Sequence, residues 1–152
     1  EWIRSYENQQ IYLNHKLLAE KDKSVEDVHE AIGPSLLQLE GVADVVNLHE
    51  IGEGSLPEHY LNMVRNGTHR KRSGDIYVAL EPNWMEGRKL GTTHGTFFSY
   101  DTHVPVVFYG GSVRQGSTLD PVHVTDIAPT VAQLLGIIEP NGCIGRPLAV
   151  GR

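Results

Sequence analysis

The apolar residues between positions 24 and 39 recur at three- and four-residue steps, which is the spacing of one face of an α-helix. They are Val25, Val28, Ile32, Leu36 and Leu39. Ser24 and Asp27 stand three residues apart at the start of this stripe and predict a capping pair. Gly33 and Pro34 interrupt the pattern. Because proline removes a backbone donor and clashes with the preceding turn, we expect a kink there or two shorter helices.

A second helix is predicted to begin near residue 55. Ser55 and Glu58 have the spacing of a capping box, and Pro57 falls in the first turn, where its missing N–H is harmless. Asn66-Gly67 predicts the end of this helix, and we prefer that interpretation to a glycosylation site at the same asparagine.

Segments of strand length, β-branched or alternating in composition, separate these helices at residues 8–14, 42–51 and 75–80. A turn is expected at 52–54. The order β-α-β-α-β over about the first 80 residues predicts a ferredoxin-like α+β subdomain. Residues 81–93 contain proline, glycines and little periodicity, so we place a boundary there, with one domain over 1–82 and a second over 83–152.

The last part of the chain follows a different pattern. Residues 104–110 have the composition of a buried strand, and residues 125–137 predict a helix with Asp126 as N-cap that ends on a glycine. One face of this helix carries Ile127, Val131, Leu134 and Leu135. One strand and one helix are too little for a two-layer domain, so we expect this part to complete a larger sheet.

Composition and charge exclude several classes of protein. A net charge of −6, from 13 basic and 19 acidic residues, argues against a nucleic-acid partner, and the basic run at 69–72 is short enough to be a solvated loop. The single Cys143 cannot form an internal disulfide. We find no apolar run of the length of a membrane span and no signal segment, and the chain opens without Met, as if cut from a longer protein.

His94 is the first candidate for metal binding. It lies between Thr93 and Gly95, where a glycine allows close approach to an ion, and histidine is a common zinc ligand. A zinc site needs at least three protein ligands, and the remaining histidines are scattered without ligand spacing, so the residues alone favour an ordinary loop histidine. His103 precedes Val104-Pro105, where it either ties backbone groups together or supports His94.

Two motifs carry a family resemblance. The segments "GTTHGTFFSYDTHVPVVFYGG" (91–111) and "DIAPTVAQLLGI" (126–137) resemble the C-terminal end of enzymes of the alkaline phosphatase superfamily. The earlier segments "SYENQQIYLNHKLL" (5–18) and "GDIYVALEPNW" (74–84) resemble most closely the bacterial phosphate monoesterases of its type I phosphodiesterase and nucleotide pyrophosphatase branch. The helix motif alone is shared with sulfatases.

The resemblance implies a fold, a cofactor and a partner. The fold is an α/β alkaline-phosphatase-like one, in which 1–82 form a ferredoxin-like α+β insert and 83–152 supply the C-terminal strand and helix of the core sheet. Such enzymes are periplasmic or secreted and hydrolyse phosphate esters with two zinc ions and a Thr or Ser nucleophile. The nucleophile and most metal ligands have no counterpart here, so we expect a C-terminal fragment that is inactive without the rest of its parent polypeptide.

The resemblance also assigns residues. His94 is implied to be a zinc ligand, while Asp101 and His103 of the same motif are supporting residues. Residues 83–93 could supply contacts to the leaving group of the substrate, with Trp84 and Arg88 as candidates, although a tryptophan such as Trp84 more often packs in a core or a loop. Two alternatives stay open: an autonomous, non-catalytic ferredoxin-like binding module, and a sulfatase-type member of the superfamily.

Overall fold

The computed structural model describes residues 1–52, 55–87 and 91–151 of the chain. It divides into two compact units, Glu1–His103 and Val104–Arg152. The predicted boundary between residues 82 and 83 separates an insert from the catalytic core of a longer enzyme. The division of this chain into compact units does not test it, so it stays a prediction. Among the described residues, no helix is long and apolar enough to cross a membrane.

The first unit is built on a four-stranded sheet in the order β1-β2-β4-β3, with every neighbouring pair antiparallel. Its strands are β1 (Ile3–Glu7), β2 (Gln10–Leu13), β3 (Val42–Asn47) and β4 (Ile76–Leu80). Its longer helices are α1 (His15–Glu20), α2 (Val25–Leu36) and α3 (Glu58–Gly67). Because β4 lies between β2 and β3, the β2-α2-β3 segment is a split β-α-β unit, which agrees with the predicted ferredoxin-like subdomain.

The three predicted strands are confirmed, but β1 and the short α1 were missed. Strand β1 forms a hairpin with β2 through Asn8 and Gln9, whose φ angles of 51° and 62° are both left-handed. Such two-residue turns are usually marked by Asn-Gly. With glutamine in the second position that signal is weak, and these two turn residues were included in the predicted opening strand.

The start of α2 is as predicted. The backbone N–H of Asp27 donates to Ser24 Oγ at 3.0 Å, and the Ser24 N–H donates to Asp27 Oδ2 at 2.7 Å, which completes a capping box. The helix continues as one element through Pro34, so the alternative of two shorter helices was wrong. Beyond the proline, the Leu37 N–H still reaches the Gly33 carbonyl at 2.9 Å.

The capping box predicted for α3 was wrong. The N-cap is Pro57, with no side-chain cap, and the backbone N–H groups of Ser55 and Leu56 donate instead to Asp44 Oδ2 at 2.8 and 3.1 Å. A residue before proline avoids the helical region of φ and ψ, so the helix begins after Pro57. Its end at Gly67 agrees with the prediction. Residues 53 and 54 of the turn predicted at 52–54 lie outside the described residues.

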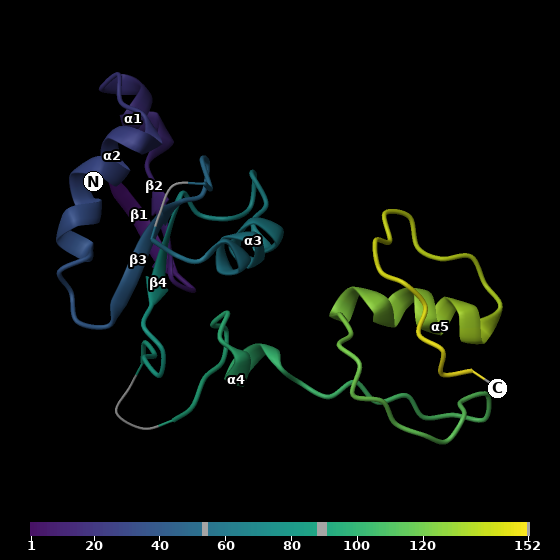
Figure 1. Ribbon diagram of the computed structural model, residues 1–152. Helices are drawn as coiled ribbons and strands as arrows, with labels where there is room; N and C mark the ends of the chain where they lie inside the picture. Colours follow the sequence, from purple (N-terminus) through teal and green to yellow (C-terminus); the bar gives the residue numbers. More distant parts are fainter. Residues whose placement is uncertain (53–54, 88–90, 152) are drawn as a thin grey trace. The chain divides into compact units, whose positions relative to one another are not determined.

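Each face of the sheet has its own cover (Figure 1). On one face, residues of β2, β3 and β4 form the main core with Leu18 of α1 and Val28 of α2. The cross-strand partners Gln10 and Tyr77 belong to the opposite pleat, because their neighbours Ile11, Ile76 and Val78 point into that core. Helix α3 lies on this second side and buries Leu61.

The second unit does not contain the predicted strand at 104–110. Among its described residues, the β pairing present is one isolated bridge between Val113 and Gly151. A strand needs a neighbouring backbone for its hydrogen bonds, and no described segment of this unit supplies one to 104–110. Val107 and Tyr109 are accordingly exposed.

The predicted C-terminal helix is confirmed as a 3₁₀ turn, η1 (Val124–Asp126), followed by α5 (Ile127–Leu135). It ends on Gly136, whose φ of 64° is the left-handed cap conformation. Asp126 is the N-cap residue of α5, as predicted, but its side chain makes no capping hydrogen bond to that helix. Its carboxylate accepts instead from the backbone N–H groups of His123 and Arg146, at 2.9 Å each, and these bonds lower its pKa.

The buried side of α5 is not the one that the apolar pattern marks. Ile127, Val131 and Leu135 lie on its exposed surface, whereas the buried residues are Pro129, Thr130 and Ala132. The tail of the chain covers that side, because the Leu148 N–H donates to Thr130 Oγ1 at 2.9 Å. The apolar face of α5 therefore has no cover among the described residues of its unit.

Candidate functional site

His94 lies in a loop of the first unit, between the sheet and the short helix α4 (Ser99–Thr102). Its side chain is exposed, as a metal ligand supplied to a shared site would have to be. Gly95 follows with φ of 127°, a conformation that residues with a Cβ rarely adopt. The backbone path directly after His94 thus depends on glycine.

One carboxylate holds this loop. Asp101 Oδ2 accepts hydrogen bonds from the Gly95 N–H at 3.1 Å, from the Thr96 N–H at 2.9 Å and from Thr96 Oγ1 at 2.7 Å. The Thr96 hydroxyl and then its N–H are the main causes that lower the pKa of Asp101. The sequence grouped Asp101 with His94, and the structure brings it into contact with the two residues that follow His94.

An aromatic cluster holds the residue that follows Thr96. Phe97 is buried, with 8% of its surface exposed, and stacks on Tyr60 of α3 with ring centroids 4.5 Å apart. It also lies 6.4 Å from Tyr77 of β4 and 4.9 Å from Phe98. Phenylalanine at 97 therefore fastens the His94 loop to α3 and the sheet. No local sequence pattern marks this contact.

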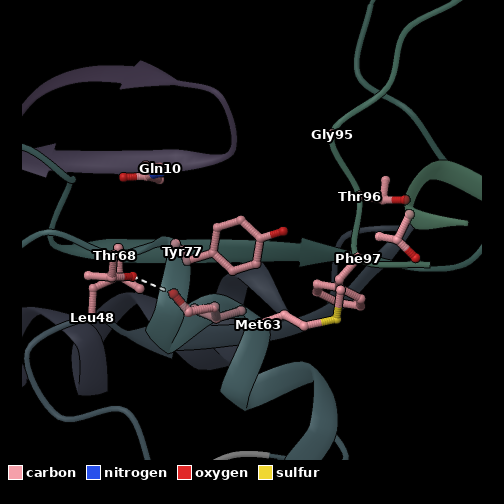
Figure 2. Close-up of a pocket in the computed structure, with 11 residues that line it drawn as sticks. Gln10, Leu48, Met63, Thr68, Tyr77, Gly95, Thr96 and Phe97 are labelled. Atoms are coloured by element: carbon pink, nitrogen blue, oxygen red, sulfur yellow. Dashed lines mark hydrogen bonds between the residues drawn. The ribbon is translucent and has the colours of Figure 1, made fainter. Parts of the chain in front are cut away.

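A small cavity of about 240 Å³ lies beside this anchor (Figure 2). Its lining includes Gln10, Met63, Thr68, Tyr77, Thr96 and Phe97. Burial and, to a smaller extent, Glu86 raise the pKa of the Tyr77 phenol to about 12, and its hydroxyl donates to Gln9 Oε1 at 3.1 Å. No carboxylate, ammonium or guanidinium group belongs to the lining, so the cavity is uncharged at neutral pH.

His103 closes α4 through its backbone, donating its N–H to the Ser99 carbonyl at 2.9 Å. Its exposed ring makes no hydrogen bond within the described part of the chain. Whether His103 supports His94 therefore stays a prediction.

The two candidates for leaving-group contacts have different outcomes. Trp84 packs over Gly41, so closely that a Cβ on that glycine would meet the indole ring at 2.3 Å. It lines an apolar groove with Ile3 and Tyr6, and that groove shares no residue with the cavity beside Gly95. Arg88 lies outside the described residues.

Two histidines that the sequence left unpaired meet on one carboxylate. Asp75, buried just before β4, accepts from His15 Nε2 at 2.9 Å and from His49 Nε2 at 2.8 Å through the same Oδ1 atom. Its other oxygen accepts from the Leu13 N–H at 2.8 Å. Sixty and 26 positions separate Asp75 from these histidines, so no local pattern could have indicated the cluster.

The described residues can supply one ligand to a metal ion, but they do not form a complete metal site. None of their histidine, cysteine, aspartate and glutamate side chains form a group of three that could hold an ion. His94 offers a single exposed imidazole next to residues 95–97, which Asp101 and Phe97 hold in place. The chain by itself can contribute a ligand to a site that other residues complete.

Comparison with known proteins shows which proteins the chain is similar to. No protein-family model matches the chain. It is 39% identical over 148 residues to alkaline phosphatase PafA of Elizabethkingia meningoseptica and 32% identical over 139 residues to alkaline phosphatase PhoV of Synechococcus elongatus. The crystal structure of wild-type PafA superposes with a TM-score of 0.91 at 38% identity, covering 99% of this chain and 29% of that one. Along nearly its whole length, the chain is therefore similar to a segment of alkaline phosphatases, as the resemblance of its motifs predicted.

The chain spans about a quarter of the length of the curated relatives that it matches, 27% in the case of PafA. A relative from Myroides odoratus, 43% identical over 148 residues, carries the name calcium-transporting ATPase. The four-stranded antiparallel sheet with its helices fits an α+β subdomain of the alkaline-phosphatase-like fold, as the sequence predicted. Both compact units fall within the matched region, since it covers 96% and 95% of the chain in these two relatives.

Proposed function

We propose that this chain is a C-terminal portion of a zinc-dependent phosphate ester hydrolase and that His94 is the metal ligand it supplies. The observation that carries the proposal is the fixed, exposed His94 loop in a segment that superposes on PafA with a TM-score of 0.91. Two zinc ions and a Thr or Ser nucleophile belong to the complete enzyme that we envisage. The nucleophile lies outside this chain.

The role of His94 follows from its chemistry. A neutral imidazole donates its nitrogen lone pair to zinc, and bound zinc stabilises negative charge on a phosphoryl group and lowers the pKa of a coordinated water. In this proposal, the chain holds the His94 imidazole in one orientation toward the zinc ion. Gly95 sets the backbone path, while Asp101 and Phe97 hold the loop on α4 and α3.

The rest of the parent polypeptide is the proposed partner of the second unit. Residues 104–110 have strand composition without a pairing partner among the described residues, and α5 exposes Ile127 and Val131. A segment that completes a larger sheet would satisfy both features at once. The match over both units supports this proposal more than it supports an autonomous binding module. The names of the phosphatase relatives also suggest a periplasmic or secreted parent.

Substitution of His94 in the full-length protein tests the proposal. His94→Ala should reduce bound zinc and lower phosphate monoester turnover by at least about 100-fold, because an unstabilised charge at the phosphoryl group raises the barrier by several kcal/mol. His69→Ala is the matched control, since His69 is also exposed on a loop of the first unit. Unchanged zinc content and turnover in His94→Ala would contradict the proposal.

The Myroides relative supports a second candidate, hydrolysis of ATP coupled to calcium transport. The two candidates differ in substrate and in the required ion. The full-length protein should hydrolyse simple phosphate monoesters with zinc and without calcium if it is a phosphatase. Strict dependence on ATP together with calcium uptake into vesicles would favour the second candidate.

A further inference from the structure

We infer that Asp101 is a positioning residue, which fixes the direction of the His94 imidazole toward the metal. This inference rests on the proposed function, since it assumes that His94 binds zinc. It assigns a role to a side chain that is not expected to ligate the metal itself.

The hydrogen bonds of Asp101 act on the backbone immediately after His94. Both Gly95 and Thr96 direct their N–H groups to the same Oδ2 atom, at 3.1 and 2.9 Å, so the two successive peptide planes have one orientation. The Thr96 hydroxyl adds a third bond at 2.7 Å. Hydrogen bonds to a charged carboxylate are stronger than those to a neutral acceptor, so this arrangement resists rotation of the His94–Gly95 peptide.

The carboxylate is itself on a fixed element. The Asp101 N–H donates to the Phe98 carbonyl at 2.9 Å, and Thr102 Oγ1 donates to the same carbonyl at 3.2 Å. Phe97, which follows Thr96 in the chain, is buried against Tyr60. Loop residues 95–97 are therefore held by α4 through hydrogen bonds and by α3 through stacking, which leaves the exposed His94 at the end of a braced segment.

The same geometry commits one oxygen of Asp101 to the loop. Three donors already occupy Oδ2, so this oxygen is not available to an ion. Residues that orient a metal-binding histidine typically change metal affinity by about 10- to 100-fold when they are removed. Asp101 contacts the residues after His94 and is expected to act at that scale.

Zinc affinity in the full-length protein, measured by competition with a chromogenic chelator, tests the inference. Asp101→Ala should weaken zinc binding by about 10- to 100-fold. Thr96→Val removes one of the three donors with little change of shape and should weaken binding by a smaller factor. Asp101→Asn keeps an acceptor and should fall between Asp101→Ala and the wild type. Asp120→Ala is the matched control, because Asp120 is an exposed aspartate that accepts from Thr118 at 2.6 Å.

Unfolding of the zinc-free protein, measured in parallel, separates positioning from a general loss of structure. We expect Asp101→Asn to bind zinc more tightly than Asp101→Ala while the two variants unfold at similar midpoints. A purely structural role of Asp101 would not separate zinc affinity from stability in this way. If Asp101→Ala fails to fold, Thr96→Val and Asp101→Asn decide the question.

His94→Ala in the same assay distinguishes zinc binding by His94 from the positioning role of Asp101. Wild-type zinc affinity in His94→Ala contradicts the proposed function itself. Weakened binding in His94→Ala, together with wild-type affinity in Asp101→Ala and Thr96→Val, overturns the positioning role alone. Weakened binding in all three supports both.

Discussion

Replacement of Phe97 by alanine tests whether the aromatic anchor holds the His94 loop on the first unit. Phe97 exposes 8% of its surface and stacks on Tyr60 at 4.5 Å. Truncation of a buried phenylalanine to alanine costs about 3–5 kcal/mol, and a cavity of about 240 Å³ already adjoins the site, so little collapse can compensate. We therefore expect a loss of about 3 kcal/mol in the free energy of unfolding.

Two variants make this measurement specific. Phe97→Leu keeps most of the apolar volume and loses the ring stacking, so it should cost about 1–2 kcal/mol. Tyr109→Ala removes a fully exposed aromatic of the second unit and should change the free energy of unfolding by less than about 0.5 kcal/mol. The assay is urea unfolding of the 152-residue chain followed by circular dichroism, with an unchanged dependence on urea concentration. A Phe97→Ala midpoint equal to that of Tyr109→Ala would refute the anchoring role.

Three further predictions concern the rest of the chain. Hydrogen bonds from Ser24 lower the pKa of Asp27 to about 2 from the usual 3.8, so the contribution of Asp27 to stability is present above about pH 4 and is lost as the pH falls toward 2. The melting temperature of Asp27→Asn should therefore change less between about pH 4 and pH 2 than that of the wild type, and equal slopes would contradict this. Gly145→Ala would place a Cβ 2.1 Å from the Thr125 carbonyl oxygen and should destabilise the second unit by more than about 1 kcal/mol, measured by hydrogen exchange in α5. Gly116→Ala is the control, because no other atom lies within 4 Å of the Cβ that it would add. The isolated 152-residue chain should show no zinc-dependent phosphatase activity, because its described residues offer no group of three ligands; turnover by the purified chain would disprove that expectation.

Local signals in the sequence predicted the elements that depend on local interactions. The capping box at Ser24 and the glycine stop at Gly136 involve residues within a few positions of each other, and both are present as expected. Ser55 shows the limit of such signals. Its spacing to Glu58 is right for a cap, but the carboxylate of Asp44 takes the backbone donors before Pro57, and Asp44 is 11 positions away.

Features that depend on distant partners could not be predicted in this way. The Asp75 cluster draws on residues of β2, of α1, of the segment after β3 and of the position just before β4. The strand predicted at 104–110 has the right composition, yet composition cannot supply the neighbouring strand that its backbone needs. The resemblance named His94 as the ligand and Asp101 as a supporting residue, while the hydrogen bonds that Asp101 makes and the anchor at Phe97 required the structure.

Anomalous diffraction at the zinc absorption edge, from crystals of the full-length protein, tests the central claim most directly. We predict a zinc peak about 2.0–2.1 Å from a ring nitrogen of His94, the distance of a zinc–imidazole bond. The remaining ligands of that ion should come from residues outside this chain, since its described residues offer no group of three. A fully loaded zinc site with no contact to His94 would contradict the account.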